Sequence, residues 1–208
     1  MNFLFPQKFF ITGTDTEVGK TVVAAMLTLG LNGVYWKPVQ SGIEVGGDRA
    51  WIEQVTCLGK EHFRPESYAL RQPLSPHAAA RLDGIQLKIE DIFLPSVAAN
   101  THLIVEGAGG ILVPLNEHHT MLDLMVQLDL PVLIVARSTL GTINHTLLSL
   151  EALRQRQLNI LGVVLNGPLN AGNREAIEQF GRTQVVAELE PLETLTSLSL
   201  IETYTKLF

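Results

Sequence analysis

A lysine and a threonine that follow a short glycine-bounded loop are the residues best suited to chemistry in this sequence. The segment GTDTEVGKT runs from Gly13 to Thr21, directly after an apolar run at 9–11 that is typical of a buried strand. Gly19 lets the main chain approach an anion closely, and N–H groups of the loop and of a following helix can then face that anion. Lys20 adds a full positive charge, and the threonine hydroxyl can bind magnesium. This stretch therefore predicts a site for a phosphate group.

The order of strand, glycine-bounded loop and Gly-Lys-Thr is that of the P-loop nucleoside triphosphatases. Gly13 and Gly19 enclose one residue more than the strict pattern has, so the motif is complete in its second half and approximate in its first. Apolar residues at helical spacing follow the loop, and we expect a helix that Gly33 closes.

Composition places the chain among globular proteins. Its 208 residues are 46% hydrophobic and 17% charged, which suits one domain covering residues 1–208. A net charge of −6 and the lack of a basic run argue against nucleic-acid binding, because such binders displace counterions with a basic surface. No apolar stretch has the length of a membrane span or the form of a signal sequence, so we expect a cytoplasmic protein without a membrane partner. Cys57 is the only cysteine, which excludes internal disulfides, and we expect it to be a small buried residue.

Charged and polar residues stand at the ends of two further apolar runs. Lys37 and Ser41 lie in a proline- and glycine-containing loop after the run at 34–36. Ligands of a parallel α/β sheet collect at the carboxyl ends of its strands, so both side chains would stand near the phosphate loop. Glu106 ends the run at 103–105 and is followed by glycines. Because a buried carboxylate is costly without a cation, we interpret Glu106 as a magnesium ligand.

Three other segments leave a structural and a functional interpretation open. Asp48 begins an expected short helix and is either its N-cap or a metal ligand. His77 lies in a rigid proline-bounded loop, where we expect a structural role. Residues 140–145 open a helix whose free N–H groups form a second possible anion site, the alternative being ordinary capping by Ser138 or Thr139.

The remaining apolar runs alternate with helical segments. Strands are expected at 131–136, 160–165 and 184–187, and helices at 121–128, 140–157 and 171–181, before a terminal helix. This alternation predicts a single-domain α/β fold in which a parallel sheet has helices on both faces. A phosphate loop, two acids at metal positions and Lys37 together indicate phosphoryl transfer. The residues alone leave a magnesium-dependent hydrolase, kinase or ligase open.

Five segments of the chain carry a resemblance to a known family. GTDTEVGKT, YWKPVQSG, PLSPHAAA, VEGAGG and LGTINHTLL, in this order, resemble the corresponding segments of the dethiobiotin synthetases. The resemblance covers about residues 8–168, and residues 170–208 match weakly. It implies that ATP and magnesium are used to convert 7,8-diaminopelargonate and carbon dioxide into dethiobiotin, ADP and phosphate. In that family one amine becomes a carbamate, the carbamate takes the γ-phosphate, and the second amine closes the cyclic urea.

The resemblance also implies roles for individual residues. Lys37 is the principal catalytic cation, Lys20 and Glu17 lie near the reacting groups, and Ser41 contacts the substrate or its carbamate. N–H groups from a second subunit meet the substrate carboxylate across a homodimer interface. The implied nucleotide contacts are Thr16, Glu17, Val18, Gly19, Lys20, Thr21, Val22, Gly107, Ala108, Gly109, Asn166 and Gly167, the metal ligands are Thr21, Asp48 and Glu106, and the carboxylate contacts are Gly141, Thr142, Ile143 and Asn144.

Two alternatives to this interpretation remain. One is another ATP-dependent, carboxylate-activating ligase, such as those that amidate corrin side chains, although their glutamine-hydrolysing domain has no counterpart here. The other is an ATPase switch of the partition and cell-division type, which binds a partner or a membrane. Such switches carry a lysine soon after the first glycine of the loop, where this chain has Thr14 and Asp15. The segment SLIETYTKLF also lacks the basic face of a membrane-binding helix.

Overall fold

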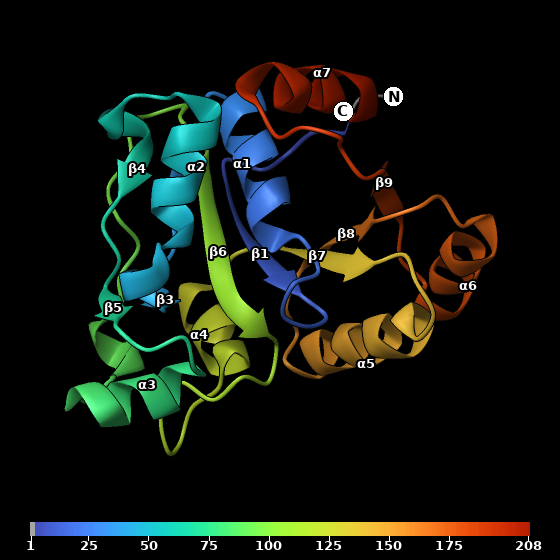
Figure 1. The fold of residues 1–208 in the computed structure, drawn as a ribbon. Coiled ribbons are helices and arrows are strands. Elements are labelled where there is room, and N and C mark those ends of the chain that lie inside the picture. The colour runs from blue at the N-terminus through green and yellow to red at the C-terminus, as the bar shows by residue number, and fades with distance from the viewer. Residues whose placement is uncertain (1–2) are drawn as a thin grey trace.

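Figure 1 shows the fold as a computed structural model, in which residues 3–208 are described. Seven strands of this part of the chain form one sheet in the order β4-β2-β6-β1-β7-β8-β9, and each neighbouring pair runs parallel. The parallel α/β class predicted from the alternation of strands and helices is therefore confirmed. The strands are β1 (Lys8–Gly13), β2 (Val34–Trp36), β4 (Phe63–Arg64), β6 (Leu103–Gly110), β7 (Val132–Arg137), β8 (Ile160–Asn166) and β9 (Val185–Leu189).

Helices cover both faces of the sheet, as Figure 1 shows. Successive side chains of the central strand β1 point to opposite faces, so Phe9 and Ile11 enter one core and Phe10 enters the other. Burial on both sides explains why these strands are continuous apolar runs in the sequence. The first core is closed by α1 (Lys20–Gly30), α2 (Asp48–Thr56) and α7 (Ser197–Leu207), and the second by α3 (Pro76–Asp83), α4 (Met121–Leu128), α5 (Thr142–Gln155) and α6 (Ala171–Gly181).

Strand β1 lies between β6 and β7 in the sheet. Its carboxyl end therefore stands in the middle of the edge where parallel α/β folds bind ligands. The strands and helices predicted after residue 120 are confirmed to within a few residues at their ends. Within residues 3–208, none of the helices combines the length and the apolar character that a membrane crossing needs.

Two helix ends differ from the sequence expectation. Gly33 was expected to close α1. The residue that ends this helix in the left-handed conformation is instead Asn32 (φ 48°). The N–H of Asn32 donates to the carbonyl of Leu29, and the N–H of Gly33 donates to that of Thr28, which is the Schellman pattern of a helix C-terminus. After α2 the left-handed position is held by Cys57 (φ 56°), which is exposed, so the expectation that this thiol is buried is wrong.

The expectation that His77 lies in a rigid loop is wrong, because the chain around it forms regular structure. Strand β3 (Val39–Ser41) pairs in parallel with β5 (Tyr68–Leu70) in a separate two-stranded sheet. Helix α3 begins at Pro76, where a missing N–H costs nothing and the fixed φ suits the first turn. His77 lies in this first turn with its Nδ1 at 3.0 Å from the Ser75 hydroxyl, a contact that agrees with the structural role expected for it.

Candidate active site

The phosphate loop, residues 14–19, connects β1 to α1 at the carboxyl edge of the sheet (Figure 1). The N–H of Thr14 donates to the carbonyl of Val135 at 3.0 Å, which ties the start of the loop to the neighbouring strand β7. Lys20 is the first residue of α1 and is 6% exposed. Its ammonium lies 2.9 Å from the carbonyl oxygen of Asp15, so the loop wraps around the lysine.

The second half of the loop is fixed by two residues that fit tightly together. Gly19 adopts the left-handed conformation (φ 96°), and a Cβ there would come within 2.1 Å of Asn166 Nδ2. Asn166 lies at the end of β8, and its Nδ2 donates a hydrogen bond to the carbonyl of Val18 at 3.0 Å. The asparagine predicted as a nucleotide contact therefore also shapes the loop, and Gly19 is required both by its φ and by this close approach.

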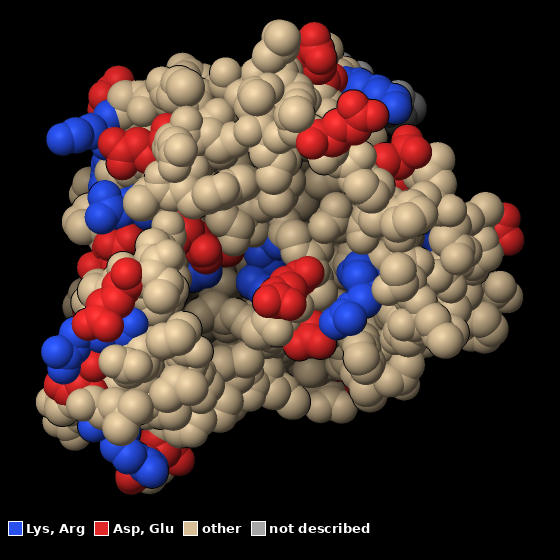
Figure 2. Space-filling model, in the orientation of Figure 1, with Lys and Arg blue, Asp and Glu red and all other residues tan. Residues whose placement is uncertain are grey.

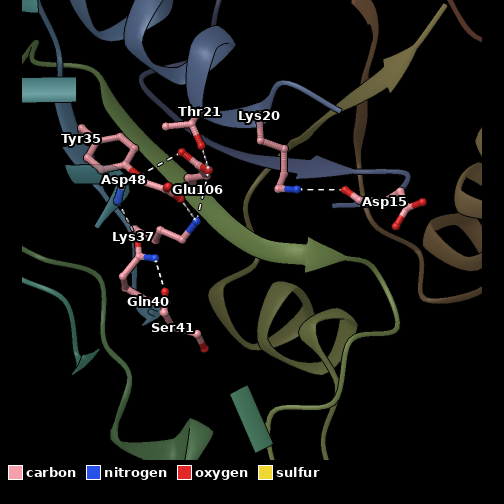
Figure 3. Close-up of polar contacts among 9 residues, drawn as sticks. All are labelled: Asp15, Lys20, Thr21, Tyr35, Lys37, Gln40, Ser41, Asp48 and Glu106. Carbon is pink, nitrogen blue, oxygen red and sulfur yellow. Dashed lines mark hydrogen bonds and ion pairs between the residues drawn. The ribbon is translucent and has the colours of Figure 1, made fainter. Parts of the chain in front are cut away.

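Glu106 is the centre of a buried polar cluster that Figure 3 shows in close-up. Its Oε1 accepts hydrogen bonds from the Thr21 hydroxyl at 2.9 Å and from the Lys37 ammonium at 3.2 Å. Its Oε2 accepts a hydrogen bond from the Tyr35 hydroxyl at 2.9 Å. Lys37 also pairs with Asp48, the first residue of α2. The structure thus brings together the three predicted metal ligands and the predicted catalytic lysine, which come from β6, α1, α2 and the segment after β2.

The charges of this cluster act on one another because they are buried. Burial alone would lower the pKa of Lys37, but the carboxylates of Glu106 and Asp48 outweigh it and raise that pKa. Burial lowers the pKa of Lys20, and Glu106 opposes part of this effect. Burial and the Glu106 carboxylate raise the pKa of Tyr35 well above its ordinary value. Its hydroxyl therefore keeps its proton and donates a hydrogen bond to Glu106. Lys37 is thereby held as a cation.

Gln40 positions the start of α2 and was not singled out from the sequence. Its Oε1 accepts the N–H of Asp48 at 3.0 Å, and its amide nitrogen donates to the carbonyl of Ser41 at 2.6 Å (Figure 3). The N-cap of α2 is Gly47, and the carboxylate of Asp48 turns to Lys37, so the capping interpretation of Asp48 is wrong. The hydroxyl of Ser41 is buried and has no hydrogen-bond partner in the part of the chain that the structure describes.

The glycines after Glu106 continue strand β6, so this glutamate lies within the strand and not at its end as expected. Gly107 faces the core, because a Cβ there would come within 2.8 Å of the Phe10 ring. Gly109 (φ 65°) lies beside the phosphate loop, where a Cβ would stand 3.7 Å from Thr16 Cγ2. Of these two glycines, Gly109 is the one that stands close to a phosphate-loop residue.

The start of α5 is open to a ligand. The helix follows Gly141 (φ 95°), and within residues 3–208 no side chain caps it, so side-chain capping by Ser138 or Thr139 is wrong. The main-chain carbonyl of Thr139 nevertheless accepts the N–H of Thr142 at 3.2 Å. The hydroxyl of Thr142 is buried without a partner in this same part of the chain. Leu140, just before the helix, is fully exposed. In the order of the sheet this helix follows β7, on one side of β1, whereas Glu106 and Tyr35 lie on β6 and β2, on the other side.

A cavity of about 490 Å³ lies between the phosphate loop and α5. Its lining is largely apolar, apart from the start of the loop and two polar residues of the helix. The lining residues are Thr14–Thr16 of the loop, Gly110 at the end of β6 with Ile111–Pro114 after it, and His145, Leu148, Ser149 and Ala152 of α5. This hollow borders the segment from which the predicted carboxylate contacts come.

Comparison with known proteins places the chain in a family. The family described as AAA domain matches residues 7–199. A protein of Paramagnetospirillum magneticum named ATP-dependent dethiobiotin synthetase is 47% identical over 191 residues, which cover 92% of this chain and 91% of that protein. The chain belongs to the dethiobiotin synthetase family. The resemblance inferred from five short segments is thereby confirmed, and the family match extends into the weakly matching C-terminal part as far as residue 199.

Two further relatives agree with this assignment. A Brucella melitensis protein named ATP-dependent dethiobiotin synthetase is 41% identical over 201 residues, 97% of this chain and 94% of that protein. A bifunctional biotin biosynthesis protein of Bordetella avium is 49% identical over 191 residues, and this chain covers 91% of its own length but 41% of that longer protein.

Solved structures with the same fold are much more distant in sequence. A ParA family ATPase from Chlorobium tepidum is 14% identical with a TM-score of 0.56, and the match covers 96% of both chains. The septum site-determining protein MinD of Pyrococcus horikoshii, solved with Mg-ADP, is 14% identical with a TM-score of 0.52 over 96% of this chain and 94% of that one. At these identities the likeness shows the fold alone, and it confirms the predicted P-loop NTPase-like architecture.

The contact between Gly19 and Asn166 predicts unequal effects of two glycine substitutions. Gly84, after α3, is also left-handed (φ 67°), but nothing lies within 4 Å of a Cβ built there. Gly84→Ala should lower the free energy of unfolding by about 1–2 kcal/mol, the cost of a left-handed alanine. Gly19→Ala should cost at least about 1 kcal/mol more, because Asn166 must also move. Urea unfolding measures both, and equal losses would show that the contact is unimportant.

The Tyr35 hydroxyl predicts a loss of stability on its removal. Tyr35→Phe leaves Glu106 Oε2 buried without its donor, which should lower the free energy of unfolding by about 1–3 kcal/mol in urea denaturation. Tyr68→Phe is the matched control, because its hydroxyl makes an exposed hydrogen bond to Lys88 that water can replace. If the two variants lost the same stability, Tyr35 would not be the support for Glu106 that its geometry suggests.

Proposed function

We propose that this chain is an ATP- and magnesium-dependent dethiobiotin synthetase. It carboxylates 7,8-diaminopelargonate with carbon dioxide, activates the product with ATP and closes the ureido ring, giving dethiobiotin, ADP and phosphate. The observation that carries this proposal is the buried cluster of Lys37, Glu106 and Asp48 beside a phosphate loop, in a chain 47% identical to a named synthetase. Such a cluster supplies the cation and the metal-binding oxygens that phosphoryl transfer needs.

The phosphate loop is proposed to hold the triphosphate of ATP. Residues Thr16 to Val22 hold the phosphates through their backbone N–H groups, except that of Thr16, which donates to Asp15 Oδ1. The buried ammonium of Lys20 adds charge where little water screens it. Asn166 and Gly167 at the end of β8 are assigned to the adenine side, and Ala108 and the glycines beside it to the other flank. The hydrogen bond from Asn166 to Val18 supports this arrangement, because it joins the proposed adenine side to the loop.

The residues of the cluster fit a magnesium ion. Two carboxylates share the single ammonium of Lys37, which leaves negative charge beside the Thr21 hydroxyl. Magnesium is usually held by one or two carboxylates together with substrate phosphates, and within the described residues no larger group of acids, histidines or cysteines is present. Thr21, Asp48 and Glu106 would hold the ion. When bound, it neutralises charge on the phosphates.

The buried cation explains how an anion can attack a polyanion. The substrate carbamate oxygen attacks the γ-phosphorus and ADP leaves; the second amine then attacks the carbonyl carbon of the mixed anhydride, and phosphate leaves. Two unit charges a few ångströms apart repel by several kcal/mol in a partly dry site, roughly 4 kcal/mol at 4 Å. Lys37, whose pKa is raised by Glu106 and Asp48 against the effect of burial, stays charged and offsets this repulsion. Ser41 offers a hydroxyl without a partner among residues 3–208 to the carbamate, and the exposed Glu17 lies near the reacting groups.

The start of α5 is proposed to meet the substrate carboxylate in a homodimer. No side chain that the structure describes caps the N–H groups from Gly141 to Asn144. The N–H of Thr142 donates to the main-chain carbonyl of Thr139, and the others can bind an anion supplied across an interface. Exposed leucines around this helix support a second subunit there. They are Leu112 at 65%, Leu140 at 101% and Leu148 at 63% exposure.

An ATPase switch remains the alternative from another class. The fold likeness to a ParA family ATPase and to MinD does not favour it, because 14% identity carries no functional information. The 41–47% identity to named synthetases, over more than nine-tenths of the chain, favours the enzyme.

The proposed reaction and the role of Lys37 can be tested together. The purified chain with ATP, magnesium, bicarbonate and 7,8-diaminopelargonate should form dethiobiotin, detected by mass, with one ADP per product. Lys37→Gln should lower the rate by about two orders of magnitude or more and leave ATP binding largely intact, because its charge acts mainly in the transition state.

Lys60→Gln, a change of the same kind at an exposed lysine, is the control and should keep full activity. Phosphate release that does not depend on the diamine would favour the switch over the synthetase. Normal turnover by Lys37→Gln would remove Lys37 from the mechanism.

The dimer proposal predicts a specific effect of charge on α5. Sedimentation at micromolar concentration should give twice the chain mass, and Leu148→Glu should shift this mass toward the monomer and reduce activity. Leu198→Glu on α7 is matched in exposure, 64% against 63%, and should leave the dimer intact. A fully active monomeric wild type would refute a site shared between subunits.

A further inference from the structure

Arg137 makes a contact with the phosphate loop that the mechanism above does not use. The guanidinium of this last residue of β7 donates from Nη2 to Asp15 Oδ2 at 2.7 Å. The two side chains are 42% and 47% exposed, and a pair between charges as exposed as these adds little to stability. The stability of the fold therefore does not account for this contact.

Asp15 gives the loop its shape. Its Oδ1 accepts the N–H of Thr16 at 2.7 Å, and its main-chain carbonyl accepts a hydrogen bond from the Lys20 ammonium at 2.9 Å. This single residue thus orders both the backbone of the loop and the lysine that is to meet a phosphate.

The carboxylate of Asp15 also creates an electrostatic problem. From Gly13 to Thr21 the chain carries two acids, Asp15 and Glu17, and one lysine, so a loop built for a polyanion has a net negative charge. Figure 2 shows acidic and basic side chains meeting around the hollow in the middle of this face. Arg137 pairs with the Asp15 carboxylate, and its charge brings the stretch from Gly13 to Thr21 to neutrality.

We infer that Arg137 is a positioning residue that neutralises Asp15, so that this carboxylate can order the phosphate loop without repelling the nucleotide. The inference rests on the proposed function only in taking ATP as the ligand of the loop. Arg137 acts through Asp15 and does not itself touch the phosphates.

Calorimetric titration with ATP and magnesium tests this inference. Arg137→Gln should raise the Kd for ATP about tenfold at low ionic strength, and the difference should shrink as salt is added, because Asp15 is then screened. Arg137→Lys should restore most of the affinity. Arg156→Gln is the control, because Arg156 is similarly exposed, at 41%, and its 2.9 Å ion pair joins the end of α5 to Asp123 of α4, away from the loop.

The double variant Asp15→Asn/Arg137→Gln distinguishes charge compensation from a direct action of the arginine on the nucleotide or on the fold. An asparagine still accepts the Thr16 N–H but carries no charge, so the double variant should bind ATP within about twofold of the wild type. If it binds as weakly as Arg137→Gln alone, the arginine acts directly, and the inference is overturned. Equal binding by wild type and Arg137→Gln would also overturn it. A wild type that binds no ATP would instead count against the proposed function.

Discussion

The buried carboxylate of Glu106 is the interaction on which the rest of the site depends. A charge with no exposed surface is tolerated only when both oxygens are paired, and here Thr21, Lys37 and Tyr35 provide three donors from three elements. The glutamate also fixes each donor. The start of α1, strand β2 and the segment after β2 are thereby fixed around one residue of β6. The sheet brings these elements together, and the carboxylate sets their spacing.

The phosphate loop is held separately in its two halves. Arg137 at the end of β7 contacts Asp15 in the first half, and Asn166 at the end of β8 contacts Val18 in the second. These two residues are register partners in the parallel pairing of β7 and β8. The additional residue between the two glycines of the motif therefore does not leave the loop unsupported. Neighbouring strand ends supply contacts to a loop that is one residue longer than the strict pattern.

The strand ends that bear on the site could be predicted from the sequence, and the side-chain pairs between them could not. Apolar runs followed by Lys37 and Glu106 indicated where the chemistry lies, because parallel strands present their carboxyl ends at one edge. Tyr35 was missed because it is part of such an apolar run and only the structure shows its hydroxyl on Glu106. The Arg137 contact joins residues far apart in the chain, for which periodicity contains no signal. Helix α3 was missed because Pro76 was interpreted as a loop residue, although the preceding serine and the following alanines suit a helix start.

Helix α7 lies against α1, as Figure 1 shows, and Tyr204 leaves no room for a side chain at Gly30. The helix that begins with Lys20 is thus covered by residues far along the chain. The position of Lys20 therefore depends on packing at the opposite end of the sequence, because α7 covers the helix that this lysine begins.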